Sequence, residues 1–106
     1  MSDNYHTVKA VFTFKDTSCK DKFIDFCNGD KGLSVTRRWE GCKSIECYEV
    51  EDNHLVVIIW QKWETRENQE SYVKFRHDDG SFDFLGELIS TPPEISVLRW
   101  VTFKTD

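Results

Sequence analysis

The stretch HLVVIIWQKWETRENQESYVKFRH, from His54 to His77, predicts a buried strand that runs directly into an amphipathic helix. Residues 55–59 are apolar without interruption, and β-branched side chains dominate them, which is typical of a strand covered on both faces. Thr65 ends this pattern, and its hydroxyl is suited to accept a free amide N–H of the first helical turn. Such a strand and helix form half of a small α+β sandwich, and the remaining sequence must supply the other half.

Length and composition predict one domain over residues 1–106, beginning with a polar tail at residues 1–4. The chain has 106 residues, of which 39% are hydrophobic and 14% aromatic. A domain of this size buries roughly 60–70% of the surface of its unfolded chain, which is enough for one core without covalent staples.

The net charge of −5 argues against a nucleic-acid partner and against an anionic membrane surface, because both would repel the chain. The sequence has no apolar run of about 18 residues and no basic-then-apolar beginning, so neither a membrane span nor a signal peptide is expected. We therefore expect a soluble, cytoplasmic protein.

The cysteines do not follow a metal or redox motif. The chain has four, Cys19, Cys27, Cys42 and Cys47, and no two of them form a CxxC pair. The three histidines do not complete a metal-binding spacing with them. We expect reduced, mostly buried thiols and no metal, although two disulfides or a redox role are the alternatives.

Upstream of the opening stretch, the pattern predicts a strand and an interrupted helix. Residues 5–14 alternate between an apolar and a mixed face, which is typical of a strand. A helix then starts at Ser18 with Asp21 in its first turn, and it turns Phe23, Phe26 and Cys27 toward the sheet. Two glycines and an Asn within residues 28–32 interrupt it, and residues 33–39 resume a short helix.

The remaining segments predict three further elements around the central strand. Residues 44–51 alternate with polar groups on both faces, so this strand is expected at an edge, joined to the central strand by a tight hairpin at 52–53. Ser81 is expected to cap a short helix that points Phe82, Leu85, Leu88 and Ile89 inward. Pro92 and Pro93 end that helix, and residues 94–103 are the last strand.

The resulting order, βαββαβ, predicts a ferredoxin-like α+β fold with an antiparallel sheet. Right-handed crossovers place the helices on one face of the sheet. The other face would be bare although Val11, Leu98 and Trp100 are apolar, and an exposed apolar sheet requires a partner. We therefore expect a symmetric homodimer in which two sheets form a dimeric α/β barrel.

Six short motifs follow one another along the chain. They are Gly32-Leu33-Ser34-Val35-Thr36-Arg37, Gly41-Cys42-Lys43-Ser44-Ile45-Glu46-Cys47-Tyr48, Ile59-Trp60-Gln61-Lys62-Trp63-Glu64-Thr65-Arg66-Glu67, Tyr72-Val73-Lys74-Phe75-Arg76, Leu85-Gly86-Glu87-Leu88 and Pro92-Pro93. In this order and spacing the chain resembles the antibiotic biosynthesis monooxygenase (ABM) domain family of the dimeric α/β-barrel superfamily, from about residue 8 to residue 101.

The resemblance implies a homodimer with a pocket between the helices and the sheet of each subunit. Members of the family include oxygenases that act on quinols, phenols or anthrone-like aromatics without metal or flavin, so no cofactor is expected. Haem-degrading relatives use an Asn, a Trp and a His. This chain has no Asn in its first strand, Tyr72 at the helix position where that Trp, or in many members a His, is expected, and Phe82 near the position of the final His. Haem turnover is therefore not expected.

Two residues are candidates for catalysis. Tyr72 could donate a hydrogen bond to a substrate oxygen, and its alternative role is that of a core tyrosine. His77 could act as a general base, but it stands at the end of the predicted helix, where the helix dipole alone favours a positive charge.

Five further residues are candidates for substrate binding. They are Trp60, Trp63, Arg37, His6 and Phe75. The two tryptophans lie on opposite faces of one strand, so at most one lines the pocket while the other packs in the core or on the partner. Arg37 could hold an anionic oxygen or be a solvated surface residue. His6, on the apolar face of the first strand, could face the pocket or be a satisfied core histidine.

Two classes of function fit this sequence. The first is a cofactor-independent monooxygenase or oxidase for a small aromatic, quinol- or phenol-like substrate, and we favour it. The second is a non-catalytic dimer of the same fold that binds a small ligand or a partner. Oxygen uptake by the metal-free protein would distinguish the two.

Overall fold

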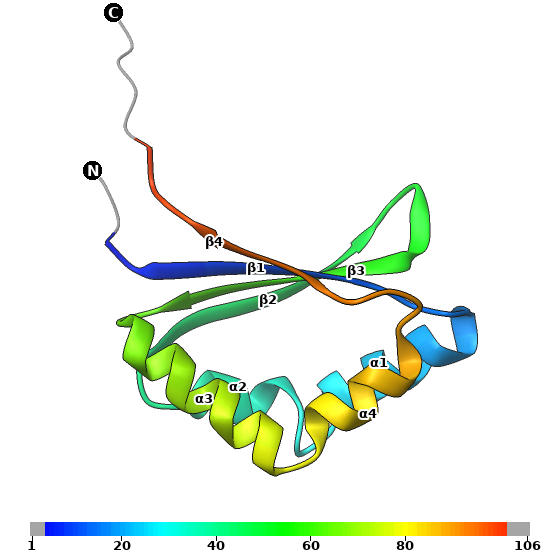
Figure 1. The fold of residues 1–106 in the computed structure, drawn as a ribbon, viewed down its shortest axis with the longest axis horizontal. Coiled ribbons are helices and arrows are strands. Elements are labelled where there is room, and N and C mark those ends of the chain that lie inside the picture. Colours follow the sequence, from blue (N-terminus) through cyan, green and yellow to red (C-terminus); the bar gives the residue numbers. More distant parts are fainter. Residues whose placement is uncertain (1–3, 102–106) are drawn as a thin grey trace, which may run out of the picture.

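The computed structural model describes residues 4–101. Its sheet consists of β1 (His6–Thr13), β2 (Cys42–Val50), β3 (Asn53–Trp63) and β4 (Glu94–Leu98), in the order β2-β3-β1-β4, with all neighbours antiparallel. The helices α1 (Thr17–Asn28), α2 (Leu33–Arg38), α3 (Arg66–Asp78) and α4 (Ser81–Leu88) lie on one face of it (Figure 1). The predicted ferredoxin-like α+β fold is confirmed.

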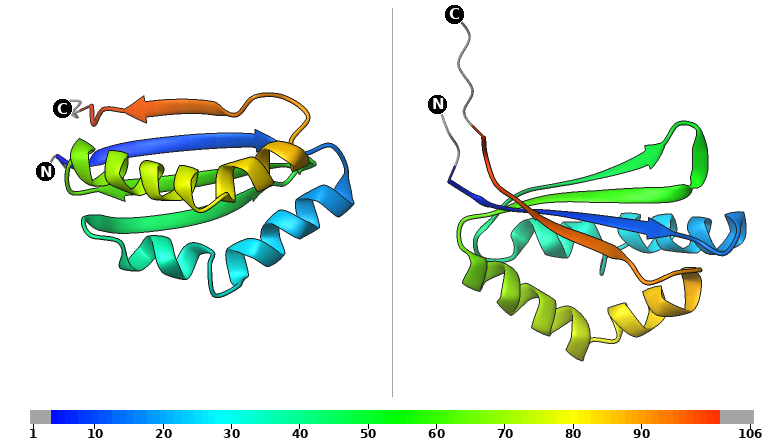
Figure 2. Two further views of the ribbon diagram at one scale, coloured as in Figure 1. Left: turned by 60° about the horizontal axis from the view of Figure 1, so that its bottom comes forward. Right: turned by 45° about the horizontal axis from the view of Figure 1, so that its top comes forward.

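The helices form two rows beneath the sheet. In one row α3 and α4 follow one another, and in the other α1 and α2 do so beside β2 (Figure 2). Strand β4 is at the opposite edge of the sheet, and its Ile95 and Val97 are 57% and 53% exposed. The two rows therefore leave the β4 side of the helix-bearing face uncovered.

The alternation of each strand decides which residues form the core. In β1 the side chains of Val8, Ala10 and Phe12 are buried toward the helices. The register of β1 with β3 pairs Ala10 with Ile59 and places both on that face. The core cluster also contains the following side chains from the helices, β2 and the rest of β3: Phe14, Phe23, Cys27, Ile45, Val57 and Leu88.

The opposite face of the sheet has no helix over it (Figure 1). It carries Val11 paired with Ile58 and Lys9 paired with Trp60. The same alternation puts Leu98, the partner of Thr7, on this face. The predicted bare apolar face is thus present, and β2 is an edge strand as expected.

The helix starts were predicted correctly for α3 and incorrectly for α1. The Thr65 hydroxyl accepts a hydrogen bond from the Asn68 amide at 3.1 Å, which caps α3. At α1 the cap is Asp16 rather than Ser18, because the Asp16 carboxylate accepts from the Cys19 amide at 2.8 Å. This bond lowers the pKa of Asp16, and the helix begins at Thr17.

The prediction for α4 was partly wrong. Ser81 does not cap the helix, which instead follows Gly80 in the left-handed region, at φ 85°. The short turn between α3 and α4 rotates the helix so that Phe84 packs on Phe26, with ring centroids 5.7 Å apart. Phe82, which was expected to point inward, lines the cavity between the helices and the sheet and is 36% exposed.

The last strand is shorter than predicted, since β4 ends at Leu98 rather than at residue 103. Residues 102 and 103 of that prediction, and 1–3 of the predicted tail, lie outside the described residues.

Cys19, Cys27, Cys42 and Cys47 are free thiols, of which Cys27 is buried. Between residues 4 and 101, no three His, Cys, Asp or Glu side chains are grouped to hold a metal ion. No helix in this range has the length and apolarity needed to cross a membrane.

We expect Gly32→Ala to lower the free energy of unfolding by about 1–3 kcal/mol, as overpacking does. A Cβ atom at residue 32 would lie 2.1 Å from the Phe26 carbonyl oxygen and 2.4 Å from that of Cys27, and backbone atoms cannot yield easily. Gly86→Ala is the control, because a Cβ there meets no atom within 4 Å. It should raise the free energy by about 0.5–1 kcal/mol through helix propensity. Urea titration followed by tryptophan fluorescence measures both values, and equal midpoints would contradict the expectation.

Candidate functional site

A cavity of about 530 Å³ lies between the helices and the sheet. Side chains of all four strands and all four helices described line it, and most of them are apolar. Its aromatic and aliphatic walls include Val8, Ala10, Phe12, Phe23, Phe26, Leu33, Ile45, Ile59, Phe84 and Leu85. Its size and apolar lining are those of a site for a small organic molecule.

Few polar side chains reach this cavity. Among the described residues they are Gln61, Gln69, Tyr72, Arg76 and Ser81, in addition to the Cys27 thiol. No carboxylate and no histidine belongs to the lining that the structure describes. The ability of the cavity to bind or react therefore depends on which of these polar atoms are still free.

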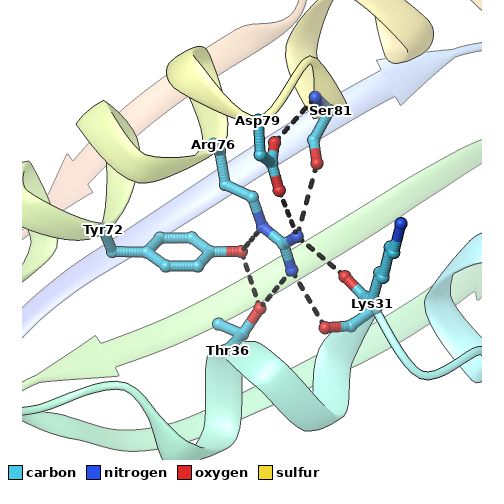
Figure 3. Close-up of polar contacts among 7 residues, drawn as sticks. Lys31, Thr36, Tyr72, Arg76, Asp79 and Ser81 are labelled. Atoms are coloured by element: carbon cyan, nitrogen blue, oxygen red, sulfur yellow. Dashed lines mark hydrogen bonds and ion pairs between the residues drawn. The ribbon is translucent and has the colours of Figure 1, made fainter.

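The guanidinium of Arg76 is the most buried of these groups, with only 3% of the residue exposed. Its Nε donates to the Tyr72 hydroxyl at 2.7 Å (Figure 3). Its Nη2 donates to the Gly32 carbonyl at 2.9 Å and to the Thr36 hydroxyl at 3.1 Å. Its Nη1 donates to the Lys31 carbonyl at 2.8 Å. The side chain thus joins α3 to α2 and to the turn before α2.

The second N–H of Nη1 is also occupied. It faces the carboxylate of Asp79 at 3.4 Å and the hydroxyl of Ser81 at 3.3 Å. Burial raises the pKa of Asp79, but hydrogen bonds from Ser81 and the charge of Arg76 outweigh this and hold the pKa below its ordinary value. Every N–H of the guanidinium therefore has an acceptor, and a ligand would meet its charge rather than a free donor.

Three aromatic rings also surround the guanidinium of Arg76. Its central carbon lies 5.5 Å from the ring centroid of Phe26, 5.2 Å from that of Tyr72 and 5.4 Å from that of Phe75. At these distances a cation is attracted to the ring faces. The positive charge is thus held at the cavity wall by aromatic rings as well as by oxygen atoms.

Tyr72 lines the cavity with its ring, while its hydroxyl is already bonded. The hydroxyl accepts from Arg76 and lies 2.6 Å from the Thr36 hydroxyl, with which it shares a further hydrogen bond. Its ring packs on Trp63, with centroids 5.2 Å apart. The role of Tyr72 as a donor to a substrate oxygen stays a prediction, and it would require this network to rearrange.

Gln61 is a polar residue on the apolar, helix-facing side of β3, between Ile59 and Trp63. The indole N–H of Trp63 donates to its Oε1 at 2.8 Å. The amide nitrogen of Gln61 makes no hydrogen bond to any residue in the range 4–101, and the side chain lines the cavity. Gln69, in the first turns of α3, also lines the cavity and has no side-chain partner among the described residues.

Cys27 is the remaining lining residue with an ionisable group. Its thiol donates a hydrogen bond to the sulfur of Cys47 on β2, and this bond and burial raise the pKa of Cys27. The same bond lowers the pKa of Cys47. Cys27 is thus a neutral thiol in the cavity wall and not a base.

The structure brings Trp63 and Tyr72 together and separates them from Trp60. Trp63 is fully buried behind the cavity wall, with 0% exposure, and contacts Tyr72 and Gln61 rather than the cavity itself. Trp60 lies on the opposite face of the sheet, paired with Lys9 and Glu46. The prediction that at most one of the two tryptophans approaches the pocket agrees with this arrangement.

Four other predicted residues lie outside the cavity. His77 is exposed and contacts the edge of Phe82, with ring centroids 5.7 Å apart. Arg37 is exposed on α2. Phe75 stacks on Trp39, with centroids 4.8 Å apart, and is half-buried away from the lining. None of the three lines this cavity, because helix phase turns them away from it, and their predicted roles stay predictions.

His6, the fourth, lines a different pocket at the end of the sheet. Asn4, Tyr5, Glu64, Thr65, Arg66, Val97, Leu98, Arg99 and Trp100 line this pocket with it. The Nε2 atom of His6 is buried and has no hydrogen-bond partner within residues 4–101. The satisfied core histidine that was considered as the alternative is therefore not what the structure shows.

Sequence reasoning missed Gln61, Gln69 and the central role of Arg76. Gln61 could have been found, because it is the one polar position among the helix-facing residues from Val57 to Trp63. Arg76 stands near the end of a helix in the sequence, and three of its acceptors, on Lys31, Gly32 and Thr36, come from residues 40 to 45 positions earlier. No local pattern reveals such a partner set.

Comparison with known proteins gives structural likeness without sequence likeness. No family model and no curated protein matches the sequence. A crystal structure of an antibiotic biosynthesis monooxygenase superposes with a TM-score of 0.79 at 11% identity, covering 91% of this chain and 98% of the other. The chain has the fold of the antibiotic biosynthesis monooxygenases.

Two further proteins share this ABM fold with the chain at slightly higher identity. Rv0793 from Mycobacterium tuberculosis has a TM-score of 0.74 at 18% identity, covering 96% of this chain and all of the other. A conserved protein from Methanosarcina mazei has a TM-score of 0.73 at 18% identity, covering 89% and 92%. At such identities the likeness establishes the fold and assigns no activity.

We expect Arg76→Lys to lower the free energy of unfolding by about 3 kcal/mol or more, or to prevent folding. A lysine keeps the charge but cannot reach the carbonyls of Lys31 and Gly32 and the hydroxyls of Thr36 and Tyr72 together, so buried acceptors lose their donors. Arg37→Lys, on the exposed face of α2, is the matched control and should change the value by less than about 0.5 kcal/mol. Chemical denaturation compares the two, and similar small losses in both variants would refute the central role of Arg76.

Proposed function

We propose that the chain is a cofactor-independent oxygenase or oxidase that acts on a small aromatic, phenol- or quinol-like molecule bound in the cavity between helices and sheet. The observation that carries this proposal is the cavity of about 530 Å³. Its apolar and aromatic walls hold one buried cation, Arg76, and the unpartnered NH₂ groups of Gln61 and Gln69. The likeness of the fold to a protein named antibiotic biosynthesis monooxygenase supports the choice of reaction class.

The chemistry asks little of the protein, because the substrate supplies the electrons. In an anthrone-like substrate, a CH₂ group attached to the aromatic rings loses a proton, and the resulting anion reacts with O₂. The carbon becomes a carbonyl, one oxygen atom stays on it, and the other leaves as water with the two hydrogens. A quinol instead gives a quinone and hydrogen peroxide. In both cases the protein must stabilise an anion and exclude bulk water.

The lining residues are suited to stabilising that anion rather than to removing the proton. The charge of Arg76 attracts a phenolate or enolate oxygen in a medium of low dielectric constant. The amide N–H groups of Gln61 and Gln69 supply hydrogen bonds. Because the described lining contains no carboxylate or histidine, the substrate loses its proton to solvent before the cavity encloses it, and the acidity of the substrate controls the rate.

A second function, non-catalytic binding of the same class of molecule, is favoured by that same lack of a base. The hydroxyl of Tyr72 is bonded to Arg76 and Thr36, so no side chain of the described lining is free to take a proton. A binding protein needs only the apolar walls and the amides. The two functions differ in turnover, not in ligand.

We expect the metal-free protein to accelerate O₂ uptake with anthrone as the substrate, above the rate in buffer. The rate should rise with pH as anthrone ionises. Gly86→Phe should abolish the acceleration, because residue 86 lines the cavity and faces open space that the ring would fill. Gly86→Ala, the smaller change at the same position, should retain it. An oxygen electrode and product analysis measure the rates.

The outcomes separate the two functions. Binding of anthrone with no uptake above buffer would leave the binding function and remove the oxygenase. Uptake that persists unchanged in Gly86→Phe would place the reaction outside this cavity.

We also propose that two copies associate through the bare face of the sheet as a homodimer. This face carries Val11, Ile58, Trp60 and Leu98 without a helix over them, and monomers rarely leave such a surface to water. A symmetric pairing of the two sheets would cover it.

Sedimentation velocity should show a dimer for the unaltered chain and a monomer for Trp60→Glu, which places a charge on this face. Ser71→Glu, which adds the same charge on the exposed side of α3, is the control and should remain dimeric. A monomeric unaltered chain would contradict the proposed assembly.

A further inference from the structure

The side-chain amide of Gln61 has a definite orientation in the cavity wall. An amide can present either its oxygen or its NH₂ group in a given direction, and the surroundings decide which. Here the neighbour is the indole of Trp63, whose nitrogen lies 2.8 Å from one of the two terminal atoms of the amide. An indole nitrogen can donate a hydrogen bond but cannot accept one. The atom of Gln61 next to it must therefore be the oxygen.

Trp63 cannot move away to release this arrangement. It is fully buried and packs on the ring of Tyr72, with centroids 5.2 Å apart. Tyr72 is itself held by hydrogen bonds to Arg76 and Thr36. The orientation of the Gln61 amide thus follows from the same network that joins α3 to α2.

With its oxygen bound to Trp63, Gln61 has only its NH₂ group left for other contacts. That group has no partner among residues 4–101, and the side chain lines the cavity. The guanidinium of Arg76 has no unused N–H, as described above. Among the described lining residues, Gln61 is therefore the donor whose direction is set by a neighbour and whose hydrogen bonds remain available to a ligand.

We propose that Gln61 determines the specificity of the cavity by donating a hydrogen bond to an acceptor oxygen of the ligand, and that Trp63 sets this polarity. The inference rests on the proposed function in one respect, namely that the cavity binds a small aromatic molecule. It adds that the molecule presents a carbonyl or phenolate oxygen to β3. A ligand that offers only an N–H donor at that point places it against the NH₂ group of Gln61. Two donors then face each other without an acceptor, and the ligand binds weakly.

The test compares naphthalenes that carry substituents of different polarity at one position, of which the ketone and the hydrocarbon are nearly equal in shape. These are 1-acetylnaphthalene, which offers an acceptor, 1-isopropylnaphthalene, which offers neither acceptor nor donor, and 1-naphthylamine, which offers a donor. Equilibrium dialysis gives their dissociation constants. We expect the unaltered protein to bind the ketone at least about fivefold more tightly than the hydrocarbon, the effect of one neutral hydrogen bond.

Variants of the two residues should each weaken the preference for the ketone. Gln61→Leu should lower the ratio of ketone affinity to hydrocarbon affinity to one or below, because the ketone oxygen is then buried without a donor. Gln61→Glu keeps an acceptor for Trp63 but presents a second acceptor to the cavity, so it should favour the amine over the ketone. Trp63→Phe keeps an aromatic ring on Tyr72 but frees the amide to rotate, so the preference for the ketone over the amine should fall. Gln69→Leu changes the other glutamine of the lining and should lower the preference for the ketone less than Gln61→Leu does. Ser71→Leu, on the exposed side of α3 and outside the lining, is the control and should preserve the ratio.

The results distinguish failure of this inference from failure of the proposed function. If the unaltered protein binds the ketone and the hydrocarbon equally, the cavity binds aromatics but Gln61 does not select among them. Loss of the ratio in Gln69→Leu and not in Gln61→Leu would also overturn the inference. If no probe binds, the proposed function fails, and the inference fails with it. Gln61→Glu keeps the test decisive where Trp63→Phe does not fold.

Discussion

A buried guanidinium that has an acceptor for each N–H is the interaction on which the helix layer depends. Arg76 reaches from α3 to the carbonyls of Lys31 and Gly32 and to the hydroxyl of Thr36. Removing its charge from water is costly, and only a nearly complete set of hydrogen bonds offsets that cost. Gly32 takes part twice, because it supplies a carbonyl and also allows α2 to begin against the end of α1, where a Cβ atom would collide.

The same network divides the polar atoms of the cavity into used and unused ones. The donors of Arg76 and the hydroxyl of Tyr72 serve the fold, so the ligand meets a cation surrounded by aromatic rings. Tyr72 supports Trp63, and Trp63 turns the oxygen of Gln61 away from the ligand. The polarity that a ligand meets at β3 is thus a consequence of interactions that hold α3 in place. Chemistry in such a site would come from the substrate, with the protein supplying positive potential and dryness.

The strands and the face of each strand could be predicted because they depend on local alternation. The uninterrupted apolar run at 55–59 predicted a central strand, and Thr65 predicted the start of α3. The alternation also separated Trp60 from Trp63 correctly. The predictions that failed depend on longer range. Ser81 was expected to cap α4, but the helix follows Gly80 in the left-handed region, and Phe84, which was not among the residues expected to point inward, packs on Phe26. His77, Arg37 and Phe75 lie outside the cavity lining for a related reason, since the sequence shows that a residue is helical but not which neighbour its helix packs on.

By itself the sequence determined the α+β class, the order of the elements, the apolar character of both sheet faces and the cap of α3, because each of these follows from residues within a few positions of one another. Only the tertiary structure decided where the cavity lies and which side chains line it. It also showed that Arg76 is a buried residue that joins α3 to α2 by hydrogen bonds, and not a surface charge. The physical reason is that a hydrogen-bond network saturates: whether a polar atom is free for a ligand depends on partners such as Lys31, Gly32 and Thr36, which are distant in the chain and meet Arg76 only after folding.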